Sequence, residues 1–279
     1  MKNVLVCSDL SDRSRAALAR AARICAEGGA ALTACTVLDH DLPSATLDRR
    51  RDEARAALSA ALSECGAAHA EIVVEVGAPV ESVGQVAERL GADLLVLGPH
   101  RHRPLRDLGG RTTMQRIVGG SRCAVLLAAG PVSDGHQRVL GCVAESPACA
   151  AALRMARDLA PGAEFRTFHA VEPPARGWFG GGDTAEQSAD ALAGAEARIA
   201  RWWDGADLPA DLPMPDILPM SLEEAFRKMR YDFDPNLVAI GAHDRPGAAP
   251  GRLGSFTEQI LRWQFCDTLI LRTPEEAAA

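Results

Sequence analysis

Short apolar runs alternate with longer amphipathic segments along the first half of the chain. The apolar runs, rich in Val and Leu, predict buried strands at residues 4–8, 31–38, 71–77, 93–98 and 123–127. Segments with helical periodicity predict helices at residues 13–26, 46–67, 80–90 and 111–120. Strands of this kind that alternate with helices are typical of a parallel sheet covered by helices on both faces. The pattern therefore predicts a doubly wound α/β domain.

The same pattern begins again after a turn-rich linker at residues 130–136. Matching features relate the two halves: Cys7 and Cys142 in the opening strands, residues 94–100 and 237–243, and finally Cys123 and Cys266. A repeat of this length indicates duplication of a whole domain and not a solenoid of short units. We expect two tandem domains with five-stranded parallel sheets, at residues 1–130 and 137–274.

The composition is that of a folded globular chain with an acidic balance. Apolar residues make up 47%, charged residues make up 24%, and the formal net charge is −7. Binding to nucleic acid or to an anionic membrane relies on dense Lys and Arg surfaces, so this charge argues against both partners. No apolar run approaches the roughly 20 residues of a membrane span, and the first residues lack a signal-peptide core. We expect a cytoplasmic protein whose partners are small molecules or other proteins.

Several motifs occur in the order that a known family uses. They are the first strand ending in Asp9 with Ser11 before a helix, Val76-Gly77-Ala78-Pro79, residues 92–100, and residues 121–127. With these motifs the chain resembles the universal stress protein family over nearly all of residues 1–129 and, more weakly, over 137–273.

The resemblance implies an adenine nucleotide alpha hydrolase-like fold with strand order 3-2-1-4-5 in each half. It implies a ligand crevice at the carboxyl ends of the first and fourth strands, which agrees with the switch-point rule for open α/β sheets. It also implies that the two halves pack as an internal pseudo-dimer, to which a further homodimer contact can be added.

Nucleotide-binding members of that family carry a loop with the order Gly, two residues, Gly, nine residues, Gly, and then Ser or Thr. Glycines let the backbone curve around phosphates, and amides at a helix start point at the anion. The matching residues are Gly98, Arg101, Arg111 and Thr112 in the first half, and Gly241, Asp244, Gly254 and Ser255 in the second. In the first half, arginine stands at two of the three glycine positions of this loop. In the second half, Asp244 stands at the middle glycine position, and its carboxylate repels phosphate.

The acid that such members use near the nucleoside is present as Asp9, but its counterpart is Ala144. Neither half therefore retains the full set of residues. The resemblance implies the following candidates for an ATP or AMP site: Asp9, Val37, Gly98, His100, Arg101, Arg111, Thr112, Gly241, Gly254 and Ser255.

These candidates also have purely structural interpretations. The basic residues of 100–111 either bind phosphate through guanidinium groups or form a solvated loop. Asp9 either contacts a ligand or caps the following helix. Gly254-Ser255 either binds a phosphate or begins a helix whose capping box includes Glu258. His100 and His243 recur at equivalent positions without a third ligand close in sequence, so we expect no metal site.

The sequence offers no nucleophile with an obvious base and no Walker-type phosphate loop. We therefore expect a stress-responsive binding or regulatory protein, rather than an enzyme, whose degenerate sites bind nucleotide weakly or not at all. The alternative is a slow ATPase or phosphotransfer protein that binds ATP in one of the two crevices, with Gly254-Ser255 as its phosphate site.

Overall fold

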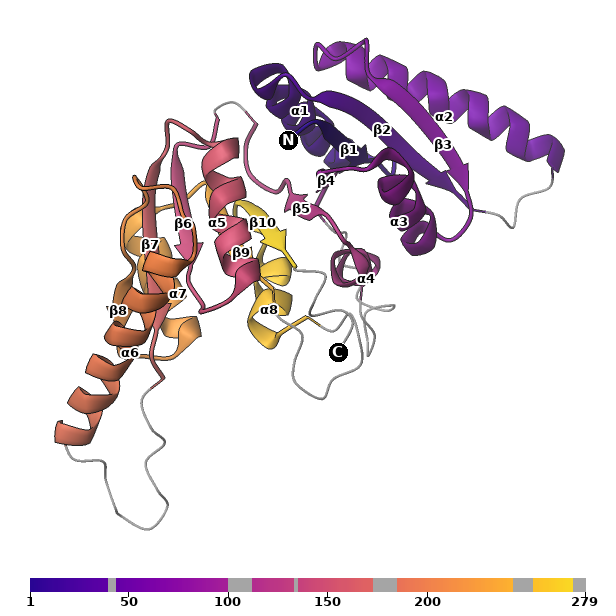
Figure 1. The fold of residues 1–279 in the computed structure, drawn as a ribbon. Coiled ribbons are helices and arrows are strands. Elements are labelled where there is room, and N and C mark those ends of the chain that lie inside the picture. The colour runs from indigo at the N-terminus through magenta and orange to yellow at the C-terminus, as the bar shows by residue number, and fades with distance from the viewer. Residues whose placement is uncertain (40–43, 100–111, 133–134, 173–184, 243–252, 273–279) are drawn as a thin grey trace. The chain divides into compact units, whose positions relative to one another are not determined.

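The computed structural model describes residues 1–39, 44–99, 112–132, 135–172, 185–242 and 253–272 (Figure 1). The chain divides into two compact units. The first unit contains Met1–Gly135 together with His243–Ala279, and the second contains His136–Ala242. Each unit is an α/β structure built on mainly parallel strands, as the alternating pattern predicts.

Five parallel strands form most of the sheet of the first unit. They are β1 (Asn3–Cys7), β2 (Ala31–Leu38), β3 (Glu71–Val76), β4 (Leu94–Leu97) and β5 (Ala124–Leu127). Their order is β3-β2-β1-β4-β5, which confirms the expected order 3-2-1-4-5. A sixth strand, β10 (Asp267–Leu271), pairs antiparallel with β5.

Helices cover both faces of this sheet. The helices of this unit are α1 (Asp12–Gly28), α2 (Ser44–Glu64), α3 (Pro79–Leu90), α4 (Thr113–Gly120) and α8 (Ser255–Trp263), and the first four cover the sheet. The pair α1 and α2 lies on one face, while α3 and α4 lie together on the other (Figure 1). Because both faces are covered, strand residues such as Leu5, Leu94 and Leu95 are buried, which accounts for the continuous apolar runs in the sequence.

The second unit repeats the first four strand positions. Its strands are β6 (Arg138–Cys142), β7 (Glu164–Ala170), β8 (Asp216–Leu218) and β9 (Leu237–Gly241), all parallel and in the order β9-β6-β7-β8. The helices are α5 (Pro147–Leu159), α6 (Ala185–Gly205) and α7 (Leu222–Phe233). Phe168 and Phe226 are the largest fully buried side chains in this unit.

The compact units differ from the two sequence repeats at the end of the chain. The segment His243–Ala279 belongs to the second repeat in sequence, yet it groups with the first unit. The reason is the pairing of β10 with β5, in which Thr268, Leu269 and Ile270 lie opposite Leu127, Leu126 and Val125. This pairing covers the outer edge of β5.

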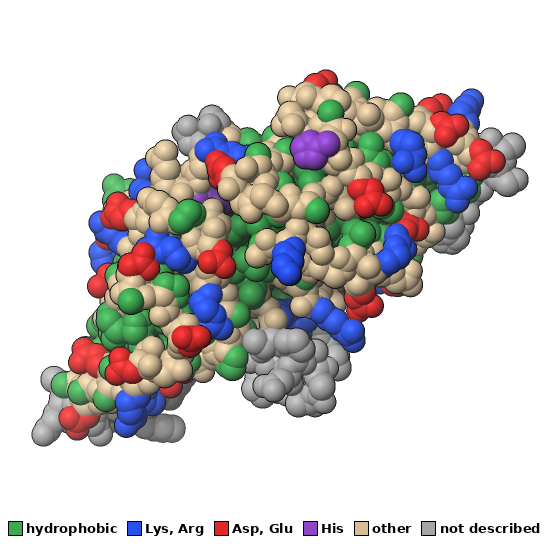
Figure 2. Space-filling model, turned by 45° about the horizontal axis from the view of Figure 1, so that its top comes forward, with side chains coloured by type: hydrophobic (Ala, Val, Ile, Leu, Met, Phe, Trp, Pro, Cys, Tyr) green, Lys and Arg blue, Asp and Glu red, His purple; other side chains and the backbone are tan. Residues whose placement is uncertain are grey.

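On the face drawn in Figure 2, the Lys and Arg side chains are interspersed with Asp and Glu. In the part of the chain that the structure describes, no helix is long and apolar enough to cross a membrane.

Candidate functional site

The carboxyl ends of β1 and β4 bring two of the expected site residues to one edge of the sheet. Cys7 and Leu97 are register partners in these neighbouring parallel strands, so Asp9 and Gly98, which follow them, lie at the same edge. The chain order of the sheet reverses between β1 and β4, and such a switch point is where open α/β sheets bind ligands. Val37 lies near the same end of β2 and is partly exposed.

The carboxylate of Asp9 is fixed by the residue that starts the next helix. Its Oδ1 accepts hydrogen bonds from the backbone N of Ser11 at 3.1 Å and from the Ser11 hydroxyl at 2.5 Å. Partial burial alone would raise the pKa of Asp9, but the hydrogen bonds from Ser11 and Ser14 outweigh it and hold the pKa below its ordinary value. Asp9 is therefore an ionised acceptor at neutral pH.

The interpretation of Asp9 as a helix cap is wrong. The N-cap of α1 is Ser11, and no side chain caps this helix. Asp9 instead bonds two residues ahead and closes a local turn, which short acidic side chains readily do outside helices.

The loop between β1 and α1 contains a strained residue that sequence patterns did not reveal. Leu10 has a φ of 61°, a region that non-glycine residues rarely occupy, and its apolar side chain is exposed. The turn is held by a hydrogen bond from the Leu10 amide to the Ser8 hydroxyl at 3.0 Å, and Ser8 and Ser14 share a hydrogen bond at 2.7 Å. Strain of this kind occurs more often at ligand sites than elsewhere.

A helix packs closely on the glycine at the end of the fourth strand of each repeat, and the contact is tighter in the second repeat. A Cβ at Gly98 would lie 3.3 Å from the Cα of Ser14 in α1. A Cβ at Gly241 would lie only 2.3 Å from the backbone N of Cys149 in α5. At position 241 glycine is therefore required by the approach of the helix to the strand, whether or not a ligand binds.

The helix starts that would face phosphate differ between the repeats. Thr112 is the N-cap of α4 in a capping box, in which its hydroxyl accepts from the Gln115 amide at 3.2 Å and its amide donates to Gln115 Oε1 at 2.9 Å. Gly254 is the N-cap of α8, where no side-chain cap occurs, so the capping box expected from Ser255 and Glu258 is absent. His100, Arg101 and Arg111 lie outside the described residues, as do His243 and Asp244.

The residue equivalent to Asp9 in the second repeat is Ala144, which has no carboxylate. The amide of Ala144 donates to Cys149 Sγ at 3.4 Å, and Ser146 caps α5 by accepting from the Cys149 amide at 3.1 Å. Burial raises the pKa of the Cys149 thiol to about 11, so this sulfur is a structural group.

The Universal stress protein family model matches residues 1–128 and, a second time, residues 135–272. The chain belongs to the universal stress protein family.

Solved structures of this family share the tandem architecture. A universal stress protein from Archaeoglobus fulgidus DSM 4304 has a TM-score of 0.72 at 17% identity, covering 97% of this chain and 98% of that one. A putative universal stress protein from Pseudomonas aeruginosa UCBPP-PA14 has a TM-score of 0.66 at 15% identity, covering 100% and 95%. At these identities the likeness establishes the fold alone. No curated protein matches the sequence.

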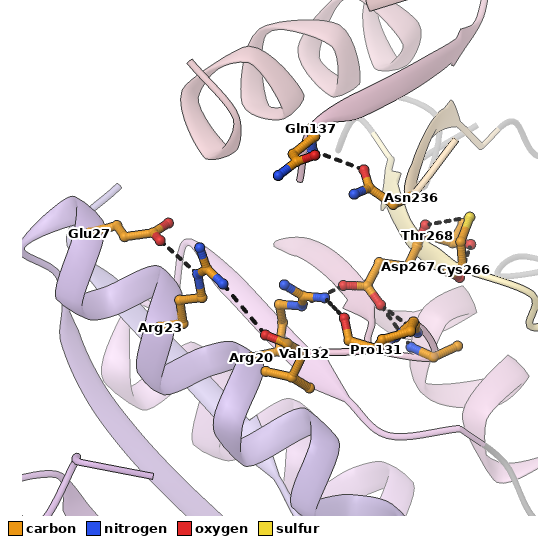
Figure 3. Close-up of polar contacts among 12 residues, drawn as sticks. Arg20, Arg23, Glu27, Pro131, Val132, Gln137, Asn236, Cys266, Asp267 and Thr268 are labelled. Atoms are coloured by element: carbon orange, nitrogen blue, oxygen red, sulfur yellow. Dashed lines mark hydrogen bonds and ion pairs between the residues drawn. The ribbon is translucent and has the colours of Figure 1, made fainter. Parts of the chain in front are cut away.

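A buried ion pair in the first unit of this universal stress protein was not anticipated from the sequence (Figure 3). Arg20 Nε of α1 lies 2.7 Å from Asp267 Oδ2 of β10, with side-chain exposures of 4% and 0%. Asp267 Oδ1 also accepts from the amides of Ala129 and Gly130 at 3.0 and 2.8 Å, and Arg20 Nη2 donates to the Pro131 carbonyl at 2.6 Å. These contacts connect β10 and the segment after β5 to α1.

A separate hollow of this universal stress protein lies between α3 and α4. It has a volume of about 250 Å³ and a mainly apolar wall that includes Val80, Val83, Ala87, Leu95, Ile117 and Cys123. Ion pairs between Arg122 and Glu88, at 3.1 Å, and between Arg116 and Glu81, at 3.6 Å, lie beside it. The lining residues Ala92 and Cys123 precede β4 and β5, so this hollow lies near the amino ends of these strands, whereas Asp9 follows the carboxyl end of β1.

Proposed function

We propose that this universal stress protein is a binding protein whose first-repeat crevice holds an adenine nucleotide weakly and does not turn it over. The observation that carries the proposal is the position of Asp9 and Gly98 at neighbouring strand ends, at the switch point of the sheet. An ionised carboxylate at such an edge accepts hydrogen bonds from ribose hydroxyls or from an adenine amino group.

Two further features support binding at this edge. The strained Leu10 is held next to Asp9 by surrounding hydrogen bonds, so the loop is fixed before any ligand arrives. The basic side chains Arg101 and Arg111, taken from the sequence, supply positive charge that can pair with phosphate oxygens in place of the family's glycine amides.

The same residues account for low affinity and for the absence of turnover that we propose. The hydroxyl and amide of Thr112 are already bonded to Gln115, and a bound phosphate has to compete with that capping box. The Ser8 and Ser14 hydroxyls bond to each other, the Ser14 hydroxyl also donates to the Ser11 carbonyl, and the Ser11 hydroxyl donates to Asp9, so all three are in structural contacts. Such contacts favour binding over nucleophilic chemistry.

Calorimetric titration with ATP tests the proposal. For the parent chain we expect a Kd of roughly 0.1–1 mM, about 4–5.5 kcal/mol of binding free energy. Asp9→Ala should weaken binding at least about tenfold, because hydrogen bonds to a charged acceptor contribute roughly 1.5–3 kcal/mol. Asp12→Ala is the matched control, since the Asp12 side chain is 97% exposed and lies within α1. Equal affinity of the parent and Asp9→Ala chains would contradict the proposal.

A second titration assigns the role of the arginines. If Arg101 and Arg111 bind phosphate, the double variant Arg101→Gly with Arg111→Gly should bind ATP more weakly than the parent chain. If their side chains obstruct the site, the same variant should bind more tightly. The slow-ATPase alternative predicts that the parent chain releases phosphate from ATP and that Ser255→Ala, in the second repeat, abolishes this release.

A further inference from the structure

Cys7, the last residue of β1, is the register partner of Cys35, which lies within the neighbouring strand β2. Adjacent strands of a sheet lie about 4.8 Å apart, and in-register residues of a parallel pair project to the same face. That separation falls within the roughly 4.4–6.8 Å between Cα atoms that a disulfide spans. Both cysteines are free thiols in the structure.

The two thiols already contact each other. They share a side-chain hydrogen bond in which the Cys7 thiol donates to the Cys35 sulfur. This bond raises the pKa of Cys7 and lowers the pKa of Cys35. Cys35 is completely buried, whereas Cys7 is partly exposed. The pair therefore joins a buried thiol of increased acidity, Cys35, to a partly exposed partner, Cys7.

The second repeat lacks this arrangement. Cys142, which is equivalent to Cys7, has Phe168 as its register partner on the neighbouring strand. The nearby Cys149 sulfur donates to the Cys142 carbonyl at 3.4 Å, and burial raises its pKa to about 11. A pair of in-register cysteines is thus a feature of the first repeat, and the second repeat provides an internal comparison.

We propose that Cys7 and Cys35 form a reversible disulfide when the protein meets a peroxide. One thiolate attacks a peroxide oxygen, so that an S–O bond forms, the O–O bond breaks and hydroxide leaves as water after protonation. The second thiol then attacks the resulting sulfenic acid, forming the S–S bond and releasing a second water. Two thiols are oxidised and one hydrogen peroxide is reduced to two waters. A dithiol reductant reverses the step by exchange through a mixed disulfide.

The oxidised pair would act on the candidate crevice through the chain. Cys7 directly precedes Ser8 and Asp9, and Cys35 lies two residues before Val37 on the same strand. A covalent bond from the last residue of β1 to β2 restricts the start of the loop that carries Asp9. The disulfide itself does not depend on nucleotide binding, so the two proposals fail separately.

Peptide mapping of the intact chain tests the proposal. The protein is treated with hydrogen peroxide, its remaining thiols are alkylated, and it is digested without reduction by trypsin and a glutamyl endopeptidase. Cleavage after Lys2, Arg13, Glu27 and Arg49 separates Cys7 from Cys35 and both from Cys25. We expect residues 3–13 linked to residues 28–49, and loss of this species after treatment with dithiothreitol.

Variants and internal cysteines supply the controls. Cys7→Ser and Cys35→Ser should each abolish the linked peptide, while Cys25→Ser should leave it in place because burial raises the Cys25 pKa to about 11. Cys142 should stay alkylatable, because no cysteine is its register partner. Recovery of Cys7 and Cys35 as alkylated thiols in the parent chain after peroxide, or linkage of Cys7 to Cys25 instead, would overturn the proposal. These readouts use the parent chain, so they stand even if a serine variant does not fold.

Discussion

A side chain at position 241 would collide with the backbone of α5. The Cβ of an alanine there would lie 2.3 Å from the Cys149 N and 2.6 Å from its Cα, and neither atom belongs to a flexible side chain. We predict that Gly241→Ala lowers the free energy of unfolding by about 2 kcal/mol or more, because α5 has to move off β9. Urea denaturation followed by circular dichroism measures the change.

Gly194 provides the matched control for this substitution. It lies within α6, and a Cβ added there would have the Arg198 Nη1, at 3.9 Å, as its nearest side-chain neighbour. Gly194→Ala should stabilise the chain by roughly 0.5–1 kcal/mol, since alanine is the better helix former. Equal effects of the two substitutions would contradict the packing explanation for Gly241.

The carboxylate of Asp93 makes the free energy of unfolding depend on pH in the acidic range. Its Oδ2 accepts from the amides of Lys2, at 2.5 Å, and Asn3, at 3.0 Å, and these bonds lower the pKa of Asp93 in the folded chain. Its stabilisation is therefore complete above the unfolded pKa of about 3.9 and is lost as the pH falls through the lower folded value.

We predict that Asp93→Asn reduces stability at neutral pH and makes the free energy of unfolding fall less steeply below about pH 4. Denaturant titrations across this range compare the variant with the parent chain. Asp12→Asn is the control, because the Asp12 side chain is 97% exposed. A slope unchanged by Asp93→Asn would show that the hydrogen bonds at the start of β1 do not favour the ionised carboxylate.

At the scale of elements, the ion pair between Arg20 and Asp267 connects α1 to β10. Removing one member leaves a buried charge uncompensated, which typically costs about 3–5 kcal/mol. We predict a loss of this size for Asp267→Ala, which also leaves the amides of Ala129 and Gly130 without their acceptor. Arg15→Ala should cost less than about 1 kcal/mol, since Arg15 pairs with Glu64 on the surface.

The double variant Arg20→Met with Asp267→Leu separates the charge effect from packing. It should be more stable than Asp267→Ala alone, because apolar side chains of similar size leave no buried charge. If both variants unfolded at the same denaturant concentration as the parent chain, the ion pair would have no part in holding β10.

Element bounds were largely readable from the sequence, whereas side-chain partners were not. The apolar run at residues 31–38 coincides with β2, because a strand buried by helices on both faces is apolar along its whole length. The helix starts at Ser11 and at Gly254-Ser255 are confirmed, but the structural interpretations that made Asp9 a cap of α1 and Glu258 part of a capping box in α8 are wrong. Several Ser, Asp and Gly residues near each start compete for the capping role. Arg20 and Asp267 stand in ordinary sequence contexts near opposite ends of the chain, and only the pairing of β10 with β5 brings them together.

The candidate site was also only partly predictable. The family motifs identified the edge of the sheet where Asp9 and Gly98 lie, because strand ends follow from the strand order. They did not reveal that packing requires the glycine at 241, which depends on how closely α5 approaches β9, or that Leu10 is strained, which depends on the local hydrogen bond to Ser8.

At the scale of the whole molecule, two copies of one fold differ at the residues from which we propose a nucleotide site. The first repeat carries Asp9 at its switch point, and the second carries Ala144 at the equivalent position. Since the acid distinguishes the repeats, we assign ligand binding to the first crevice.

A crystal structure of the chain grown with ATP in excess tests that assignment most directly. We predict nucleotide density at the carboxyl ends of β1 and β4, with a ribose or adenine atom within hydrogen-bond distance of the Asp9 carboxylate. Nucleotide bound beside Ala144 and Ser255 with the first crevice empty would contradict the assignment.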